Sequence, residues 1–281
     1  MSKSRLVVHA LLIVYAALLA YVILGLVFNY YVSADVFFDL SFALLFFAIA
    51  QAVYELGVRK AALFFILTTM IGYAAEVLGT NVGIPFGKYS YSDVLGERVL
   101  GVPIVVPVVW FVIAYICLSM MRTRKKAGRG DRQIILTTII TAFGVVAWDF
   151  LIDPMFSSQS YGYWTWSSHQ LIPTTLSGVP LTNFLGWFVV AMIMVSLFLY
   201  ITKGSNPMMK RGNTTDSVII YVLLMIDGTV ANIALGHALV VIIGVTAMLA
   251  FIVVSRVLSM KEEAKEESSQ LKGVPVQTGK Q

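Results

Sequence analysis

Charge is scarce in this sequence. Only 12% of its 281 residues are Asp, Glu, Lys or Arg, while 58% are hydrophobic. A typical soluble domain carries about twice that share of charged residues. Apolar runs of about twenty residues recur along the chain, and such runs are typical of helices that cross a bilayer. The composition therefore excludes a soluble globular protein and indicates an all-α polytopic membrane protein.

Cysteine and histidine are scarce as well. Cys117 is the one cysteine, which excludes an internal disulfide and a cysteine-based metal site. The three histidines, His9, His169 and His237, are scattered and show no metal-ligand spacing. We therefore predict neither a metal site nor a cofactor.

Lys and Arg are almost absent from the loops expected on one side of the membrane. We expect eight helices, at about 6–29, 36–57, 61–79, 102–121, 134–152, 181–202, 217–235 and 238–259. Eighteen of the 20 basic residues fall in the two termini and the loops on the same side as the termini, and only Lys88 and Arg98 fall in the loops on the other side. Because basic loops stay in the cytoplasm, both termini are predicted to be cytoplasmic. The net charge of +5 then reflects topology, and we predict no nucleic-acid partner.

The domain organisation is expected to be simple. We predict one transmembrane helical domain over residues 1–260 and a charged, polar, disordered cytoplasmic tail over 261–281. The first apolar run is too long for the core of a signal peptide, so we expect it to be retained as a helix.

Acidic residues gather in the outer half of the predicted helices. Six fall there: Asp35, Asp39, Glu76, Asp149, Asp153 and Asp227. No Lys or Arg shares this layer within the helices, and we expect the inner half to have no polar continuation. A charge at membrane depth is costly and usually marks function. Glu76, Asp149 and Asp153 are therefore the candidate catalytic residues, whereas the roles of the other three acids stay open.

Asp149 and Asp153 lie four residues apart in "WDFLIDP". This spacing puts both on one face of a helix, with Cβ atoms about 6 Å apart. Two carboxylates that close do not both ionise easily, so one is expected to keep its proton and the other its charge. Pro154 is expected to end the helix.

The predicted hairpins 61–121 and 134–202 form an internal repeat. Each has an acid, an aromatic outer loop, Gly-Val-Pro and Trp-Phe, and Glu76 to Gly101 spans 25 residues, as does Asp153 to Gly178. The prolines of both Gly-Val-Pro motifs are expected in the first turn of the returning helix. The loop aromatics are Tyr89, Tyr91, Tyr161, Tyr163, Trp164 and Trp166. We expect the two hairpins to enclose a chamber.

These motifs resemble a known family. "EVLGTNVGIPFGKYSY", "WDFLIDPM", "YGYWTW" and "GVPLTNFLGW" are similar to the carotenoid-biosynthesis membrane proteins that include bisanhydrobacterioruberin hydratase and γ-carotene 1′-hydratase. The resemblance covers about residues 70–190. It implies addition of water to a terminal isoprenoid double bond of an acyclic or C50 carotenoid, without a redox cofactor.

The candidate residues suit that chemistry. Asp149 or Asp153 is the expected proton donor, with Glu76 as its partner or as the base for water. Four loop aromatics are candidates for carbocation stabilisation or end-group packing, namely Tyr89, Tyr91, Trp164 and Trp166. Asn183 could orient water or an acid, whereas Trp110 and Trp187 are expected only to pack.

We expect the protein in the cell membrane, with the site near the extracytoplasmic face. The expected partners are a lipophilic carotenoid, water and membrane lipid, and association with other enzymes of the pathway is allowed. Three alternatives stay open. They are a proton-initiated carotenoid cyclase, a membrane prenyltransferase suggested by Asp-x-x-x-Asp, and a proton-coupled transporter.

Overall fold

The computed structural model describes residues 3–28, 30, 32, 34–121, 131–168, 175–203 and 214–272. The eight expected helices are all present within these ranges. They are α1 (Lys3–Phe28), α2 (Ala34–Leu56), α3 (Val58–Val82), α4 (Val106–Met120), α5 (Asp131–Phe156), α6 (Leu181–Ile201), α7 (Thr214–Ala234) and α8 (Ala238–Lys272). The all-α prediction is confirmed.

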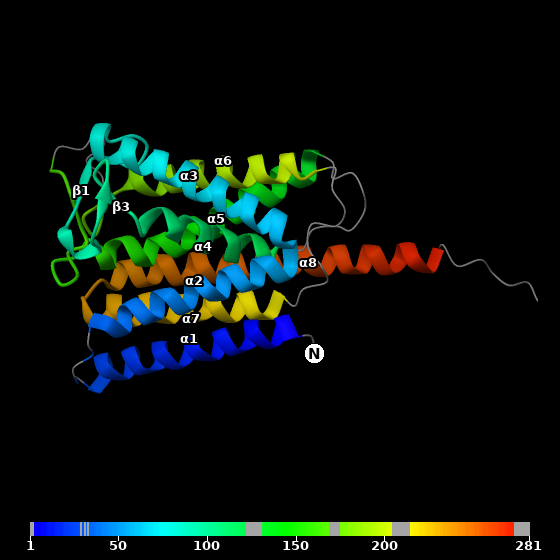
Figure 1. Ribbon diagram of the computed structural model, residues 1–281, viewed down its shortest axis with the longest axis horizontal. Coiled ribbons are helices and arrows are strands. Elements are labelled where there is room, and N and C mark those ends of the chain that lie inside the picture. The colour runs from blue at the N-terminus through cyan, green and yellow to red at the C-terminus, as the bar shows by residue number, and fades with distance from the viewer. Residues whose placement is uncertain are drawn as a thin grey trace, which may run out of the picture.

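The helices lie side by side along the long axis of the molecule (Figure 1). The short strands gather at one end of this bundle, and the N-terminus lies at the opposite end, where α8 extends beyond its neighbours (Figure 1). We call the strand-bearing end the strand end and the opposite end the terminal end. α5 packs against both α6 and α8, and α1 packs against α2 and α7. The candidate acids of α3 and α5 thus share the strand end.

α4 is shorter than the other helices, and most of its residues are buried. Among the described residues, seven helices are long and apolar enough to cross a membrane, whereas α4 has 15 residues. At 1.5 Å per residue α4 spans about 22 Å, less than the roughly 30 Å hydrocarbon core. The predicted start at residue 102 was wrong, because Val102 and Pro103 form a strand. Pro107, rather than Pro103, lies in the first turn of α4, and Pro180 caps α6 from outside.

The two hairpins re-enter the bundle through matching turns. In the first, β2 (Arg98–Val99) pairs with β3 (Val102–Pro103). In the second, β5 (Thr175–Leu176) pairs with β6 (Val179–Pro180). Each turn has two central residues of positive φ, with Gly101 at 84° and Gly178 at 86° in second place. A turn with two positive φ values favours glycine, which explains the Gly of both Gly-Val-Pro motifs.

Two helix ends differ from the prediction. α5 continues to Phe156 with Pro154 inside it, so Pro154 does not end the helix. Its last turn gains a bond in which the backbone N–H of Ser157 donates to the carbonyl of Asp153 at 2.9 Å. α8 continues to Lys272, so part of the expected disordered tail is helical. The Glu, Lys and Ala residues that follow Met260 favour a helix. Residues 273–281 of the expected tail lie outside the described residues.

Candidate active site

Glu76 is buried near the end of α3 and accepts hydrogen bonds from three ring side chains. Tyr91 Oη donates to its Oε2 at 2.7 Å, and Tyr89 Oη donates to the same oxygen. Trp110 Nε1 donates to Oε1 at 2.9 Å. The relative exposure of Glu76 is 3%. A buried carboxylate needs such partners, and here all three are neutral aromatic donors.

Tyr89 and Tyr91 belong to β1 (Tyr89–Tyr91), outside the helices. Burial raises the pKa of both phenols well above the ordinary value of 10.0, and the neighbouring Glu76 carboxylate raises it further. Asp153 also contributes to raising the pKa of Tyr89, so this phenol lies within electrostatic reach of both acids. Both tyrosines therefore remain O–H donors throughout the neutral pH range.

Asp149 and Asp153 share one amide donor. Asn183 Nδ2, from the first turn of α6, donates to Asp149 Oδ2 at 2.9 Å and to Asp153 Oδ2 at 2.7 Å. All three side chains are buried, with relative exposures of 1% for Asp149, 3% for Asp153 and 1% for Asn183. The amide holds the two carboxyl groups together, so a proton on one of them is close to the other.

Asp153 has two further donors, whereas Asp149 has none among the described residues. Trp164 Nε1 and Trp166 Nε1 donate to Asp153 Oδ1 at 2.9 and 3.1 Å. Asp153 thus accepts three hydrogen bonds and Asp149 accepts one. The two members of the pair have different surroundings although they lie on one helix face.

The two aromatic loops are joined by an antiparallel strand pair. β1 pairs with β4 (Trp164–Trp166), and Tyr89 lies opposite Trp166 while Tyr91 lies opposite Trp164. The ring centroids of these pairs are 4.9 and 6.0 Å apart. Because the tyrosines bond to Glu76 and the tryptophans bond to Asp153, this strand pair connects the surroundings of the two acids.

The eight candidate site residues therefore come together at the strand end. They are Glu76, Tyr89, Tyr91, Asp149, Asp153, Trp164, Trp166 and Asn183. Trp110 was expected only to pack, but it also bonds to Glu76. Its signal in the sequence was its matched place in both hairpins, since Trp110 and Trp187 are 77 residues apart, as are Glu76 and Asp153.

Matched positions in the two hairpins have the same spacing but carry different side chains. At the same offset of 77 residues, Asp149 of the second hairpin corresponds to Gly72 of the first. A Cβ added to Gly72 would lie 2.6 Å from Trp110 Cδ1, so Gly72 makes room for the indole. The returning helix of the first hairpin thus gives one acid an indole donor, and the returning helix of the second gives two acids an amide donor.

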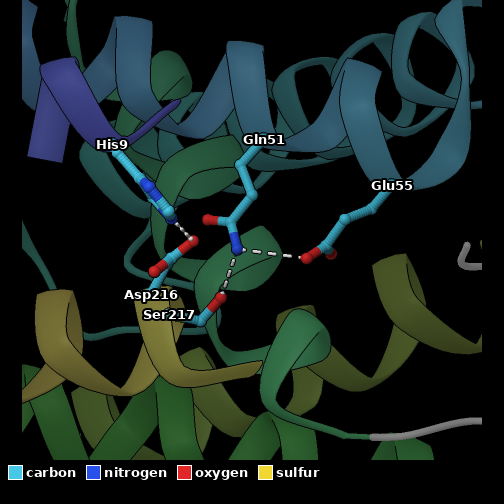
Figure 2. Close-up of polar contacts among 5 residues, drawn as sticks. All are labelled: His9, Gln51, Glu55, Asp216 and Ser217. Carbon is cyan, nitrogen blue, oxygen red and sulfur yellow. Dashed lines mark hydrogen bonds and ion pairs between the residues drawn. The ribbon is translucent and has the colours of Figure 1, made fainter. Parts of the chain in front are cut away.

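A second buried polar cluster lies in the half of the bundle toward the terminal end. This inner polar cluster consists of Gln51, Glu55, Tyr115, Ser119 and Ser217. Gln51 Nε2 donates to Glu55 at 3.1 Å and to Ser217 at 2.7 Å, with the His9–Asp216 pair beside it (Figure 2). The expectation that the inner half has no polar continuation was therefore wrong. Glu55 sits near the end of α2, where its sequence position resembled a helix terminus facing water.

The chain is similar to known proteins of carotenoid biosynthesis. The family model described as "Carotenoid biosynthesis protein" matches residues 36–251. Bisanhydrobacterioruberin hydratase of Haloarcula japonica is 29% identical over 154 residues, which cover 53% of this chain and 48% of that protein. The chain thus aligns with about half the length of this relative. No solved structure matches. The match of the family model to most of the chain shows that this protein belongs to the carotenoid biosynthesis protein family.

Proposed function

We propose that the protein is a cofactor-independent hydratase that adds water to a terminal isoprenoid C=C of an acyclic or C50 carotenoid. The observation that carries this proposal is the meeting of Glu76, Asp149 and Asp153 in a buried, aromatic setting. The family and the name of the relative support a carotenoid as substrate.

Alkene hydration needs an acid, a carbocation stabiliser and a base. We assign the acid to Asp149, because it accepts only one hydrogen bond and its Oδ1 has no partner among the described residues. Its proton adds to the less substituted carbon and leaves a tertiary carbocation. Asp153 accepts three hydrogen bonds, which suits the charged member of the pair.

The second half of the reaction restores the site. Water attacks the cation through its oxygen, and its surplus proton passes to the carboxylate of Asp153. The Asn183 amide holds Asp153 beside Asp149, so the proton has a short path back to the donor. Glu76, on the partner hairpin, would stabilise the positive charge electrostatically.

The ring side chains suit the cationic intermediate. Tyr89, Tyr91, Trp164 and Trp166 form an aromatic layer over the acids, and the faces of such rings attract cations. Their polar atoms are directed to the carboxylates. We propose that an isoprenoid end group packs against this aromatic layer.

The location of the site suits a long polyene. The strand end carries Lys88 and Arg98, whereas the opposite loops hold most basic residues, so we place the site near the extracytoplasmic face. A carotenoid within the bilayer would bring its end group to this level, where water is available. We propose the cell membrane as the location.

Two isoprenoid enzymes remain as alternatives. A carotenoid cyclase would use the same acid and the same rings but keep water out. A prenyltransferase would use the Asp-x-x-x-Asp spacing to bind a metal diphosphate. Among the described residues no group of three His, Cys, Asp or Glu side chains is arranged to hold a metal ion.

The inner polar cluster favours one further candidate, a proton-coupled transporter. Buried Glu55 and the acids of the strand end occupy opposite halves of the bundle, as a proton path across a membrane requires. Purified protein in liposomes would reveal proton-driven transport. Retention of hydratase activity in Glu55→Gln would separate the two functions.

Expression in a host that makes lycopene or its C50 derivative tests the proposed function. Pigments would be separated by liquid chromatography, and their molecular masses would be measured by mass spectrometry. We expect a more polar product, heavier by one water, with an unchanged visible spectrum. An isomer of unchanged mass would indicate a cyclase. The absence of a new pigment, with the protein verified in the membrane, would contradict the hydratase.

A further inference from the structure

Trp148 has a buried N–H group without a hydrogen-bond partner. Its Nε1 is sealed from solvent and bonds to no acceptor among the described residues, although the residue is only 7% exposed. Buried polar groups are nearly always paired, and an unpaired one calls for an explanation. An indole N–H can only donate, so the missing partner must be an acceptor.

The surroundings of Trp148 belong to the candidate site. It precedes Asp149 on α5, and its ring lies edge-on to Trp187 with centroids 6.0 Å apart. Trp187 stacks on Trp110 at 3.8 Å, and Trp110 bonds to Glu76. The three indoles thus form a continuous wall that runs from the Asp149 side of the site to Glu76.

We propose that Trp148 Nε1 binds the oxygen of the water that attacks the carbocation, and then the oxygen of the tertiary alcohol. This inference rests on the proposed function and names the residue that positions the nucleophile. Water fits the group because its oxygen accepts the N–H bond while its own protons stay free to donate.

The proposed contact is consistent with the balance of the reaction. Asp149 gives its proton to the alkene, so one C–H bond forms and the π bond is lost. The held water forms the C–O bond, and one of its O–H bonds breaks as the proton passes to Asp153. The sum is alkene plus water to alcohol. Trp148 supplies no proton, because its N–H remains intact and only orients the oxygen.

The test is Trp148→Phe, which keeps an aromatic ring and removes the N–H. We expect kcat for hydration to fall about tenfold, the scale of one lost hydrogen bond, while KM for the carotenoid changes little. The cation would also lose a proton more often instead of capturing water. The ratio of isomerised to hydrated product should therefore rise, which a packing role alone would not cause.

Stability supplies the second measurement. Trp148→Phe removes ring volume from a position that is only 7% exposed and weakens the contact with Trp187, so we expect a modest fall in Tm in a protein that stays folded. Thr141→Val is the matched control, because Thr141 Oγ1 is also buried without a partner among the described residues and lies two turns earlier on α5. It should leave kcat and the product ratio unchanged.

The outcomes separate this inference from the function it rests on. A wild type that hydrates, together with a Trp148→Phe variant of unchanged kcat and product ratio, would overturn the role of Trp148 alone. An equal loss of kcat in Thr141→Val would also overturn it, because the effect would then be structural. A wild type that yields no hydrated product would overturn both proposals.

Discussion

Asp149 and Asp153 illustrate how residues of one type acquire different roles. They lie one turn apart on α5 and share the amide of Asn183, but only Asp153 also accepts bonds from Trp164 and Trp166. Removal of a positioned acid or base costs about 10²- to 10⁴-fold in rate. We expect a loss of this size in Asp149→Asn and in Asp153→Asn, measured as hydrated carotenoid per amount of membrane protein.

The control for these variants is Asp39→Asn, since Asp39 is an exposed acid on α2. It should keep full activity. Full activity in both Asp149→Asn and Asp153→Asn, with correct insertion, would contradict the assigned chemistry.

Tyr89 and Tyr91 predict a pH dependence of stability. Their raised pKa values mean that both stay protonated in the folded protein when the unfolded chain ionises near pH 10.0. Their contribution is fully present below about pH 10 and is lost as the pH rises toward the folded pKa. The Tm in detergent should thus fall above pH 10, and Tyr89→Phe/Tyr91→Phe should show a shallower fall.

The same tyrosine variants have an effect at neutral pH. Each lost O–H leaves Glu76 with one bond fewer, at a cost of about 1 to 3 kcal/mol in unfolding free energy. An identical slope of Tm against pH in the wild type and the double variant would count against the buried phenol network.

Among the elements, α3 is shaped by a close contact with α4. A Cβ at Gly72 would meet Trp110 at 2.6 Å, and Trp110 is fully buried and stacked on Trp187. Gly72→Ala should therefore destabilise the protein by about 1 to 3 kcal/mol through overpacking, measured by thermal unfolding in detergent. Helix propensity alone predicts the opposite sign, a gain of about 1 kcal/mol.

The control on the same helix is Ile66→Ala, because Ile66 is exposed on the outside of α3. It should change stability less than Gly72→Ala does. A stabilised Gly72→Ala variant would contradict the close packing of α3 on α4.

The β1–β4 ladder can be tested with a disulfide. Ser90 lies directly opposite Thr165, and opposed residues in antiparallel strands have Cα atoms within about 5.5 Å. This separation suits a disulfide. Ser90→Cys/Thr165→Cys should form an intramolecular bond on mild oxidation, detected by mass spectrometry of a digest. Ser90→Cys/Ser168→Cys should not, and an equal yield in both pairs would contradict the register.

At the scale of the whole molecule, the positions of loops relative to the membrane remain a prediction from charge. Ser90 is exposed at the strand end, and Asp131 is exposed where α5 begins. An impermeant maleimide should label Ser90→Cys in intact cells and Asp131→Cys only after permeabilisation. Cys117 is buried and provides a low background. The reverse pattern would place the site at the cytoplasmic face.

From the order of residues alone we predict the membrane class, the eight helices, the repeated hairpins and the gathering of Glu76, Asp149 and Asp153 at one end of the bundle. Hydropathy, helix length and spacing are local properties, so a chain read in order reveals them. Even so, Glu55 and α8 beyond residue 260 were misjudged, because burial and helix continuation depend on more than hydropathy.

Which side chains meet across the bundle depends on the folded arrangement. Trp110 reaches Glu76 from 34 residues away, Tyr89 lies opposite Trp166, and Gln51 bonds to Ser217 across 166 residues. Such pairings depend on how helices pack and how two loops align as strands, which no local pattern contains. The unpaired N–H of Trp148 was equally hidden, since a missing partner becomes visible only when its neighbours have positions.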